Sequence, residues 1–376
     1  MKKRALTGAR IFDGAQIYDD AAMLLDDEIF EAIVPDHAIP STYAVTQVAG
    51  GTILPGFVDV QVNGGGGVMF NDEPSVEGLR TIANAHAGNG TRALLPTLIT
   101  DTPECLHAAV DAVEHAIKEG VAGIIGLHLE GPHISVAKKG AHDPALIRPM
   151  LDADAAFLLD AARRLPNLMV TVAPENCSPE QIGLLSDAGV IVSLGHTDCS
   201  FADAKAAFAA GARCVTHLFN AMSQLDSRAP GLVGAALQTK GVSAGLIADG
   251  IHVHASSMQV ALSAKSESGG IFLVTDAMAT AGSRIAAFRL NGRKVLRANG
   301  RLTLEDGTLA GADIDFPKSL SLLVNEVGIS PDRALGMATS APARCLRMPG
   351  AAGRFLAGNP ANAIHLNDAF HYLGAV

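Results

Sequence analysis

Polar side chains stand at the ends of apolar runs along this sequence, where they could share one site. Nearly every run of Val, Ile and Leu is followed by a carboxylate, an imidazole or an amide that would be costly to bury in a core. Such groups supply metal ligands, acids, bases and hydrogen-bond donors. One of them could be incidental, but their repetition predicts a common site. They are Gln61, Asn63, Glu130, Glu175, His196, His217, Asp249, His252 and Asp276.

Glu130, His196 and His217 are the strongest candidates for metal ligands. They follow the third, fifth and sixth apolar runs. One carboxylate oxygen and two imidazole nitrogens suit zinc or a similar first-row ion, and three protein ligands leave a position open for water. His128 and His133 are rival ligands, the first deeper on the same strand as Glu130 and the second in the loop after it.

Asp276 is the candidate acid and base. It closes the eighth run, directly after Val274 and Thr275. A carboxylate there could take a proton from an attacking water and return it to a departing amine. The alternative is an N-cap for the next helix, a position that Asp also favours. The sequence leaves both roles open.

Eight short apolar runs, separated by stretches of helical periodicity, must position these residues. Continuous apolar character is typical of strands buried on both faces. Between the runs, Thr102 and Pro103 begin a helix that Gly120 ends, and a second helix extends from about Ser200 to Gly211. Eight successive βα units predict an α/β fold, a closed (β/α)8 barrel with its chemistry at the carboxyl ends of the strands. The runs are 52–62, 91–99, 122–129, 168–173, 190–194, 213–218, 243–248 and 270–275.

An open doubly wound sheet is the alternative architecture. It would carry Gly-x-Gly-x-x-Gly after its first strand, whereas the glycine run at 64–67 has the wrong pattern. Asn291-Gly292 and Asn299-Gly300 predict β-hairpins after the eighth strand. Both ends of the chain show short strand texture, so we expect a small β-sandwich domain built from both termini. The expected divisions are 1–54 and 347–376 for the small domain and 55–346 for the catalytic barrel.

The composition limits the kinds of binding partner and the cellular compartment that we expect for this protein. The net charge of -10 is dispersed without a basic stripe, which argues against a nucleic-acid partner. No apolar run reaches the roughly 18 to 20 residues that a membrane span needs, and polar residues interrupt the start of the chain before any signal segment forms. We expect a cytoplasmic protein, because the cysteines are scattered and form no Cys-x-x-Cys pair. They are Cys105, Cys177, Cys199, Cys214 and Cys345.

Six segments, in this order, closely resemble the N-acetylglucosamine-6-phosphate deacetylase family of the amidohydrolase superfamily. The resemblance covers essentially the whole chain, and the combined pattern is highly specific within the superfamily. The segments are 55–64 (PGFVDVQVNG), 128–132 (HLEGP), 195–196 (GH), 216–222 (THLFNAM), 249–252 (DGIH) and 274–277 (VTDA).

The resemblance implies a metal-dependent hydrolase that converts N-acetyl-D-glucosamine 6-phosphate to glucosamine 6-phosphate and acetate. It implies that Glu130, His196 and His217 hold one divalent metal, with Zn²⁺ favoured. It also implies that Asp276 is the catalytic acid and base and that His142 polarises the acetyl carbonyl. The implied substrate contacts are Ala141, His142, Asn220, Ala221, Arg228, His252, Leu309, Ala310 and Gly311.

The resemblance also implies a homodimer in which Arg228 reaches the neighbouring subunit's site. An arginine suits a phosphate because its planar fork gives two parallel charge-assisted hydrogen bonds. A solvated loop residue is the plain alternative for Arg228.

The chain departs from the superfamily pattern after the first strand. Many members carry His-x-His there and bind a second metal, whereas this chain has Gln61-Val62-Asn63. Neutral amides are poor zinc ligands, so these positions are interpreted as a vestigial second-metal position and one metal is expected. Two other functions stay open: a deacetylase for N-acetylgalactosamine 6-phosphate or another N-acylated amino sugar, and a non-catalytic barrel that binds sugar phosphates.

Overall fold

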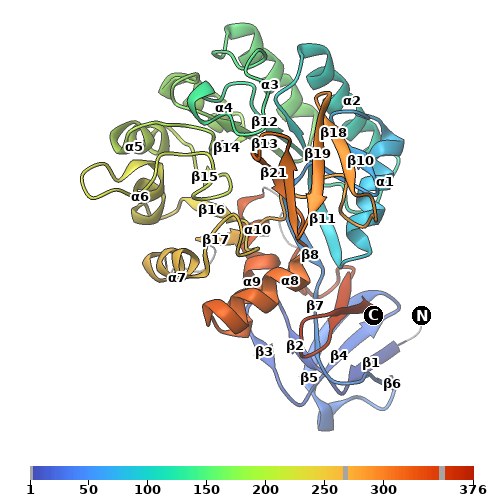
Figure 1. Ribbon diagram of the computed structural model, residues 1–376. Helices are drawn as coiled ribbons and strands as arrows, with labels where there is room; N and C mark the ends of the chain where they lie inside the picture. Colours follow the sequence, from blue (N-terminus) through green and yellow to red (C-terminus); the bar gives the residue numbers. More distant parts are fainter. Residues whose placement is uncertain (1–2, 266–269, 347–351) are drawn as a thin grey trace.

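Eight parallel strands, one from each predicted run, form the central sheet of the computed structural model (Figure 1), which describes residues 3–265, 270–346 and 352–376. The order of the strands is β17-β16-β15-β14-β13-β12-β11-β8, which is sequential around the sheet. The predicted (β/α)8 barrel is therefore confirmed. The strands are β8 (Phe57–Val62), β11 (Thr91–Ile99), β12 (Leu127–Glu130), β13 (Leu168–Val172), β14 (Ile191–Leu194), β15 (Cys214–Val215), β16 (Ser243–Leu246) and β17 (Ile271–Leu273).

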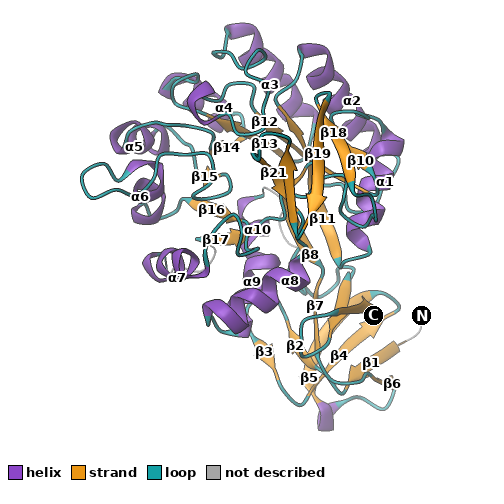
Figure 2. Cartoon of the chain, in the orientation of Figure 1, coloured by secondary structure: helices purple, strands orange, loops and turns teal. Residues whose placement is uncertain are grey.

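Helices follow the strands in alternation and cover the outside of the sheet (Figure 2). The predicted caps are confirmed, since Thr102 accepts the backbone N–H of Cys105 and Ser200 accepts that of Asp203. Among the described residues, none of the helices has both the length and the apolar character that a bilayer crossing requires. The helices are α1 (Val76–Ala87), α2 (Pro103–Lys118), α3 (Asp152–Arg164), α4 (Pro179–Asp187), α5 (Phe201–Ala209), α6 (Gly231–Gln238), α7 (Ala255–Ala264), α8 (Phe316–Leu322), α9 (Pro331–Ala338) and α10 (Ser340–Cys345).

Hydrogen bonds close the barrel between its first and last strands. The backbone N–H of Asp276 donates to the Gln61 carbonyl at 3.0 Å. Deeper in the seam, the fully buried carboxylate of Asp59 accepts the Thr275 hydroxyl at 2.5 Å and the Thr275 backbone N–H at 3.4 Å. Burial raises the pKa of Asp59 to about 7, although these hydrogen bonds oppose the rise. The seam thus ends directly at the predicted catalytic carboxylate.

The first predicted run contains two strands rather than one. β7 (Thr52–Pro55) belongs to the small domain, and β8 belongs to the barrel. Gly56 separates them, with its N–H donating to the Asn362 carbonyl at 2.9 Å. A Cβ at Gly56 would lie 2.1 Å from the Arg92 side chain, so no other residue fits this crossing without movement.

Strands from both ends of the chain form a separate β domain, as predicted. Its two sheets have the orders β5-β4-β1-β6 and β23-β22-β7-β2-β3, and Leu6, Met23, Ile11 and Ile53 pack between them. The domain boundaries given above stay predictions, and residues 347–351 lie outside the described residues. The strands are β1 (Lys3–Thr7), β2 (Arg10–Phe12), β3 (Ile17–Tyr18), β4 (Ala21–Asp26), β5 (Ile29–Pro35), β6 (Ala44–Gln47), β22 (Ala363–Leu366) and β23 (Tyr372–Ala375).

A four-stranded antiparallel sheet, inserted after β17, lies against the barrel (Figure 1). It comprises β18 (Ala287–Leu290), β19 (Arg293–Ala298), β20 (Arg301–Leu304) and β21 (Leu309–Ala312). Both predicted hairpins are present, and Asn291 and Asn299 take the positive φ values, 48° and 52°, that such tight turns require. β21 meets the barrel through a parallel bridge between Ala312 and Ala277. The inserted sheet therefore adjoins the carboxyl end of β17.

We expect Asp59→Asn to remove a pH dependence of stability. The folded pKa of about 7 lies above the unfolded value of about 4, so the folded barrel holds a proton that the unfolded chain loses. The stability from this proton is complete below about pH 4 and is lost as the pH rises through about 7. Relative to the variant, the wild-type unfolding free energy should fall by a few kcal/mol over that range in urea titrations with chelator present. Parallel pH curves for the two proteins would contradict this.

Candidate active site

A cavity of about 410 Å³ lies at the carboxyl ends of the barrel strands. Its walls come from loops that follow the strands and from β18 and β21 of the inserted sheet. The cavity gathers most of the predicted site residues. Those that line it are Asn63, Glu130, Ala141, His142, His196, His217, Asn220, Ala221, His252, Asp276, Leu309 and Gly311.

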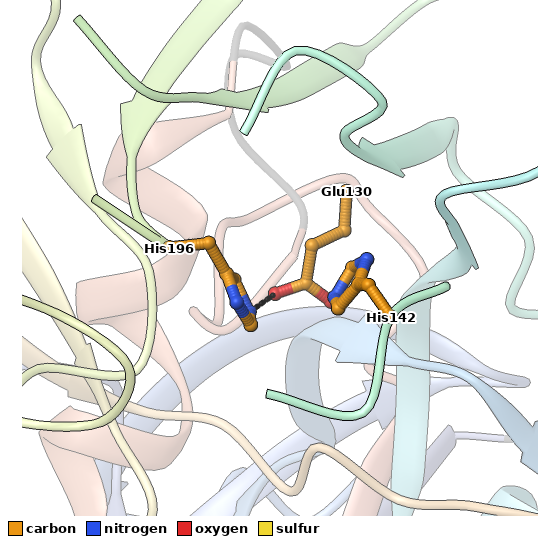
Figure 3. A group of neighbouring side chains, drawn as sticks. All are labelled: Glu130, His142 and His196. Atoms are coloured by element: carbon orange, nitrogen blue, oxygen red, sulfur yellow. Dashed lines mark ion pairs between the residues drawn. The ribbon is translucent and has the colours of Figure 1, made fainter. Parts of the chain in front are cut away.

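Glu130, His196 and His217 converge on one point in this cavity. Oε1 of Glu130, at the end of β12, lies 3.2 Å from Nε2 of His196 and 3.1 Å from Nε2 of His217. The two Nε2 atoms are 3.0 Å apart. Figure 3 shows the Glu130 carboxylate directed at the His196 ring. All three side chains are buried.

This arrangement fits a bound divalent cation. Ligand atoms around a tetrahedral zinc ion, with bonds of about 2.0 to 2.2 Å, lie roughly 3.3 to 3.5 Å apart, close to the separations here. Nδ1 of His196 donates to the Lys138 carbonyl at 2.8 Å, which leaves its Nε2 with a lone pair. A carboxylate and two imidazoles form the donor set that zinc and similar ions prefer.

The charges of the three groups depend on one another. Burial opposes ionisation of Glu130, but His196 and His217, which in their protonated forms donate to Glu130 when no cation is bound, outweigh burial and hold the pKa of Glu130 well below its usual range. Burial likewise opposes protonation of His217, while Glu130 raises the pKa of that ring. Without a cation, a shared proton stabilises the cluster.

His142 lies close enough to be a rival ligand, because Glu130, His142 and His196 can each place a ligand atom within 4.8 Å of the others. Its ring packs edge-on against the His196 ring, with 4.4 Å between the ring centroids. Thr100 determines which nitrogen of His142 carries the proton. The Thr100 backbone N–H points at Nδ1 of His142 from 3.4 Å, and the Thr100 hydroxyl oxygen lies 2.8 Å from the same nitrogen. The ring proton therefore belongs on Nε2. Burial holds the pKa of His142 well below its usual range, so the ring is neutral and donates from Nε2. Because that nitrogen carries a proton, it has no lone pair for a metal. His217 is therefore the better candidate for the third ligand.

Asp276 is held by two amide side chains at the end of the first barrel strand, Gln61 and Asn63. Oδ1 of Asp276 accepts Nε2 of Gln61 at 3.1 Å and Nδ2 of Asn63 at 2.7 Å. Gln61 also donates to Oε1 of Glu130 at 3.2 Å. Burial, together with the charge of Glu130, raises the pKa of Asp276 to about 6. A carboxyl of that pKa can both accept and return a proton near neutral pH.

The backbone is strained where these groups leave their strands. His196, His217 and Asp276 have φ values of 48°, 28° and 49°, in a region that non-glycine residues rarely adopt. At His217 this turn ends β15 after two residues, whereas the sequence predicted a run to 218. The left-handed conformation turns each side chain from the strand direction into the cavity.

Asn220 and His252 supply further polar groups to the lining of the cavity. Nδ1 of His252 pairs with Oδ2 of Asp249 at 2.6 Å, and Oδ1 of Asp249 accepts the backbone N–H of His252 at 2.8 Å. Because Asp249 occupies Nδ1, only Nε2 of His252 is available to a ligand. The hydrogen bonds to His252 keep the pKa of Asp249 below its usual value even though burial opposes this.

Two residues predicted to contact substrate lie outside the cavity wall. Ala310 is fully buried in the inserted sheet, because side chains alternate along β21 and only Leu309 and Gly311 face the cavity. Arg228 lies in an exposed loop, 224–229, before α6.

His128 and His133, the rival ligands, make other hydrogen bonds away from the cluster of Glu130, His196 and His217. His128 lies inside the barrel, with Nε2 at 2.8 Å from the Thr171 hydroxyl, and burial lowers its pKa to about 4. His133 is bonded to the Arg148 carbonyl at 3.1 Å. Glu175 accepts the Thr197 hydroxyl at 2.5 Å and supports the loop after β14.

Sequence reasoning missed Thr100 and the apolar wall of the cavity. Thr100 directly follows the second strand, so its position at a strand end was an available signal. Ile99, Met278 and Leu290 also line the cavity. No polarity or spacing distinguishes these three from ordinary core residues.

Comparison with known proteins agrees with the fold and with the geometry of the site. Residues 52–374 match the amidohydrolase family, and residues 4–53 match the NagA composite domain. The chain belongs to the amidohydrolase family. Members of this superfamily are metal-dependent, and this amidohydrolase has the His and Glu cluster that such a function needs.

Proteins similar to this amidohydrolase are named as deacetylases of N-acetylhexosamine 6-phosphates. An N-acetylglucosamine-6-phosphate deacetylase of Haemophilus influenzae is 33% identical over 100% of this chain and 98% of its own length. An N-acetylgalactosamine-6-phosphate deacetylase of Shewanella sp. (strain ANA-3) is 42% identical over 86% of this chain and 81% of its own. The crystal structure of N-acetylglucosamine-6-phosphate deacetylase from Pasteurella multocida covers 100% of this chain and 98% of that one, with 34% identity and a TM-score of 0.94. The resemblance drawn from the sequence is confirmed.

Replacing Asp276 with Asn should leave the amidohydrolase folded and metal-loaded but slow. The amide keeps the shape of the side chain and loses its basicity, so turnover should fall by about 10² to 10⁴. Turnover, circular dichroism and metal content should be measured together. Asp198→Asn, at a half-exposed residue paired with Lys138, is the matched control. Near-normal turnover of Asp276→Asn would assign proton transfer to another group.

Proposed function

We propose that this amidohydrolase hydrolyses the acetamide of N-acetyl-D-glucosamine 6-phosphate to D-glucosamine 6-phosphate and acetate. The observation that carries the proposal is the convergence of Glu130, His196 and His217 beside His142 and Asp276 in one cavity. The full-length relatives named for this reaction support the substrate.

The proposed cofactor is one divalent ion, Zn²⁺, held by Glu130, His196 and His217. Their donor set and their separations of 3.0 to 3.2 Å support it. A bound ion would supply Lewis-acid chemistry, polarising the amide carbonyl and easing the ionisation of water. Gln61 and Asn63 direct N–H groups at the carboxylates, so they favour a single ion.

Proton movements are assigned to Asp276 and His142. Asp276 takes a proton from the attacking water as the new C–O bond forms. His142 donates Nε2–H to the carbonyl oxygen, where negative charge develops. Asp276 then passes its proton to the nitrogen as the C–N bond breaks, leaving a free amine and acetate. Because both amides bond to Oδ1 of Asp276, Oδ2 keeps lone pairs for this transfer.

A second candidate differs only in the sugar. The 42% identity to a relative named N-acetylgalactosamine-6-phosphate deacetylase favours the epimeric substrate, which leaves the chemistry unchanged. The epimers differ in the orientation of one hydroxyl, so polar residues that line the cavity would discriminate between them.

Steady-state turnover of both N-acetylhexosamine 6-phosphates by metal-analysed protein tests the proposal. We expect one ion per chain, rapid acetate release from the glucosamine derivative and slower release from its epimer. A preference for the galactosamine derivative would select the second candidate. Two ions per fully active chain would contradict the single-metal site. Binding of both sugars without acetate release would favour a non-catalytic barrel.

We further propose a homodimer in which Arg228 contacts the substrate phosphate in the partner's site. Arg228 is exposed and lies outside its own cavity, so it is available to a neighbouring molecule. An enzyme of net charge -10 also needs local positive charge for a phosphate dianion. The cytoplasm is the proposed compartment, and the five free cysteines support it.

Arg228→Ala should lower kcat/KM for the phosphorylated substrate. The loss should correspond to roughly 2 to 4 kcal/mol of transition-state stabilisation, the cost of losing one partner of a buried charge pair. The unphosphorylated sugar should be affected little. Arg163→Ala, on α3 and paired with Asp160, is the control. Heterodimers of Arg228→Ala and Asp276→Asn subunits should regain activity, because one of their sites combines both intact residues. Equal losses on both sugars, or inactive heterodimers, would make Arg228 a surface residue only.

A further inference from the structure

One wall of the cavity is apolar and sealed. Ile99, Met278 and Leu290 line the cavity and also pack together in a single buried cluster with the inserted sheet. Their exposed fractions are 5%, 3% and 1%. A ligand group placed against these side chains meets apolar aliphatic and thioether groups, so a polar or charged group there would lose its hydration with little compensation.

This wall adjoins the groups that would hold the acyl carbonyl. Ile99 directly precedes Thr100, which bonds to His142 at 2.8 Å. Met278 lies two residues beyond Asp276 and also lines the cavity. The polar residues Asn220 and His252 come instead from the loops after β15 and β16.

The separation of polar and apolar lining residues onto different loops orients an amide. The sugar side of the substrate carries hydroxyls and a phosphate, which suit Asn220 and His252. The scissile carbonyl belongs beside His142 and the cluster of Glu130, His196 and His217. The remaining substituent, the carbon chain of the acyl group, then faces the apolar wall.

Leu290 is the member of the wall that the hairpin fixes in place. It ends β18, immediately before the tight turn at Asn291 and Gly292. Nδ2 of Asn291 donates to the Thr100 carbonyl at 3.5 Å, and Arg293 donates to the carbonyl of Ala141. These contacts dock the hairpin on the two segments that hold His142. Leu290 therefore has little freedom to move away from a longer acyl chain.

We propose that Leu290, with Ile99 and Met278, sets the acyl specificity of the site by leaving room for a methyl group and little more. The proposal rests on the proposed amide hydrolysis and adds the acyl class: short, unbranched and unsubstituted. One extra methylene against a closed apolar pocket typically changes kcat/KM by roughly 10- to 200-fold.

The test compares N-acetyl and N-propionyl hexosamine 6-phosphates. Wild-type enzyme should prefer the acetyl substrate by at least about 10-fold in kcat/KM. Leu290→Ala should reduce that preference by about 10-fold or more, by opening space at the end of the acyl chain. Leu290→Val makes the same test with a smaller loss of packing and should give a smaller change in the same direction.

Leu302→Ala is the matched control. Leu302 is fully buried in the same cluster, on β20, but does not line the cavity. It should lower the Tm in the way Leu290→Ala does and leave the acetyl-to-propionyl ratio unchanged. An unchanged ratio in both Leu290 variants, or an equal change in Leu302→Ala, would overturn the role of Leu290. Failure of the wild type to release acetate would instead overturn the proposed hydrolysis.

Discussion

Two imidazole nitrogens and one carboxylate oxygen lie only 3.0 to 3.2 Å apart in the cavity. The rest of the site must stabilise this close approach of three electron-rich atoms. Such atoms repel one another unless a cation or a proton lies between them. They come from strands far apart in sequence, so only a closed, rigid rim can hold them together. The left-handed backbone at His196 and His217 directs both rings inward, at a conformational cost that the packed barrel supports.

A second carboxylate close to the first adds a further electrostatic constraint. Burial raises the pKa of Asp276, and the charge of Glu130 raises it further. The Gln61 amide donates to both groups and so relieves part of the repulsion with a neutral side chain. The backbone of Gln61 also closes the barrel by accepting the N–H of Asp276. Closure of the fold and placement of the proposed catalytic carboxylate therefore depend on the same residues.

These constraints explain how much of the protein was predictable. Buried strands appear in the sequence as unbroken apolar runs, and the polar residues that meet at the rim directly follow those runs. The barrel, and the convergence of Glu130, His196, His217 and Asp276 in one cavity, could therefore be predicted. The end of β15 could not, because a positive φ at His217 leaves no mark on residue type. Which side chains of β21 face the cavity depends on how the inserted sheet packs on the barrel. The sequence therefore could not distinguish Leu309, which lines the cavity, from Ala310, which does not.

The inserted sheet and the barrel meet at Thr100, a residue whose chemistry is otherwise unremarkable. Its backbone N–H and hydroxyl hold His142, while its carbonyl accepts the Asn291 side chain from the hairpin turn. Gly131 makes the close approach possible, because a Cβ there would lie 2.2 Å from the Thr100 hydroxyl oxygen. His142, the histidine proposed to polarise the carbonyl, and the apolar wall thus share one support. A change in the hairpin that altered the acyl wall would also act on His142, which couples the choice of substrate to the rate of its hydrolysis.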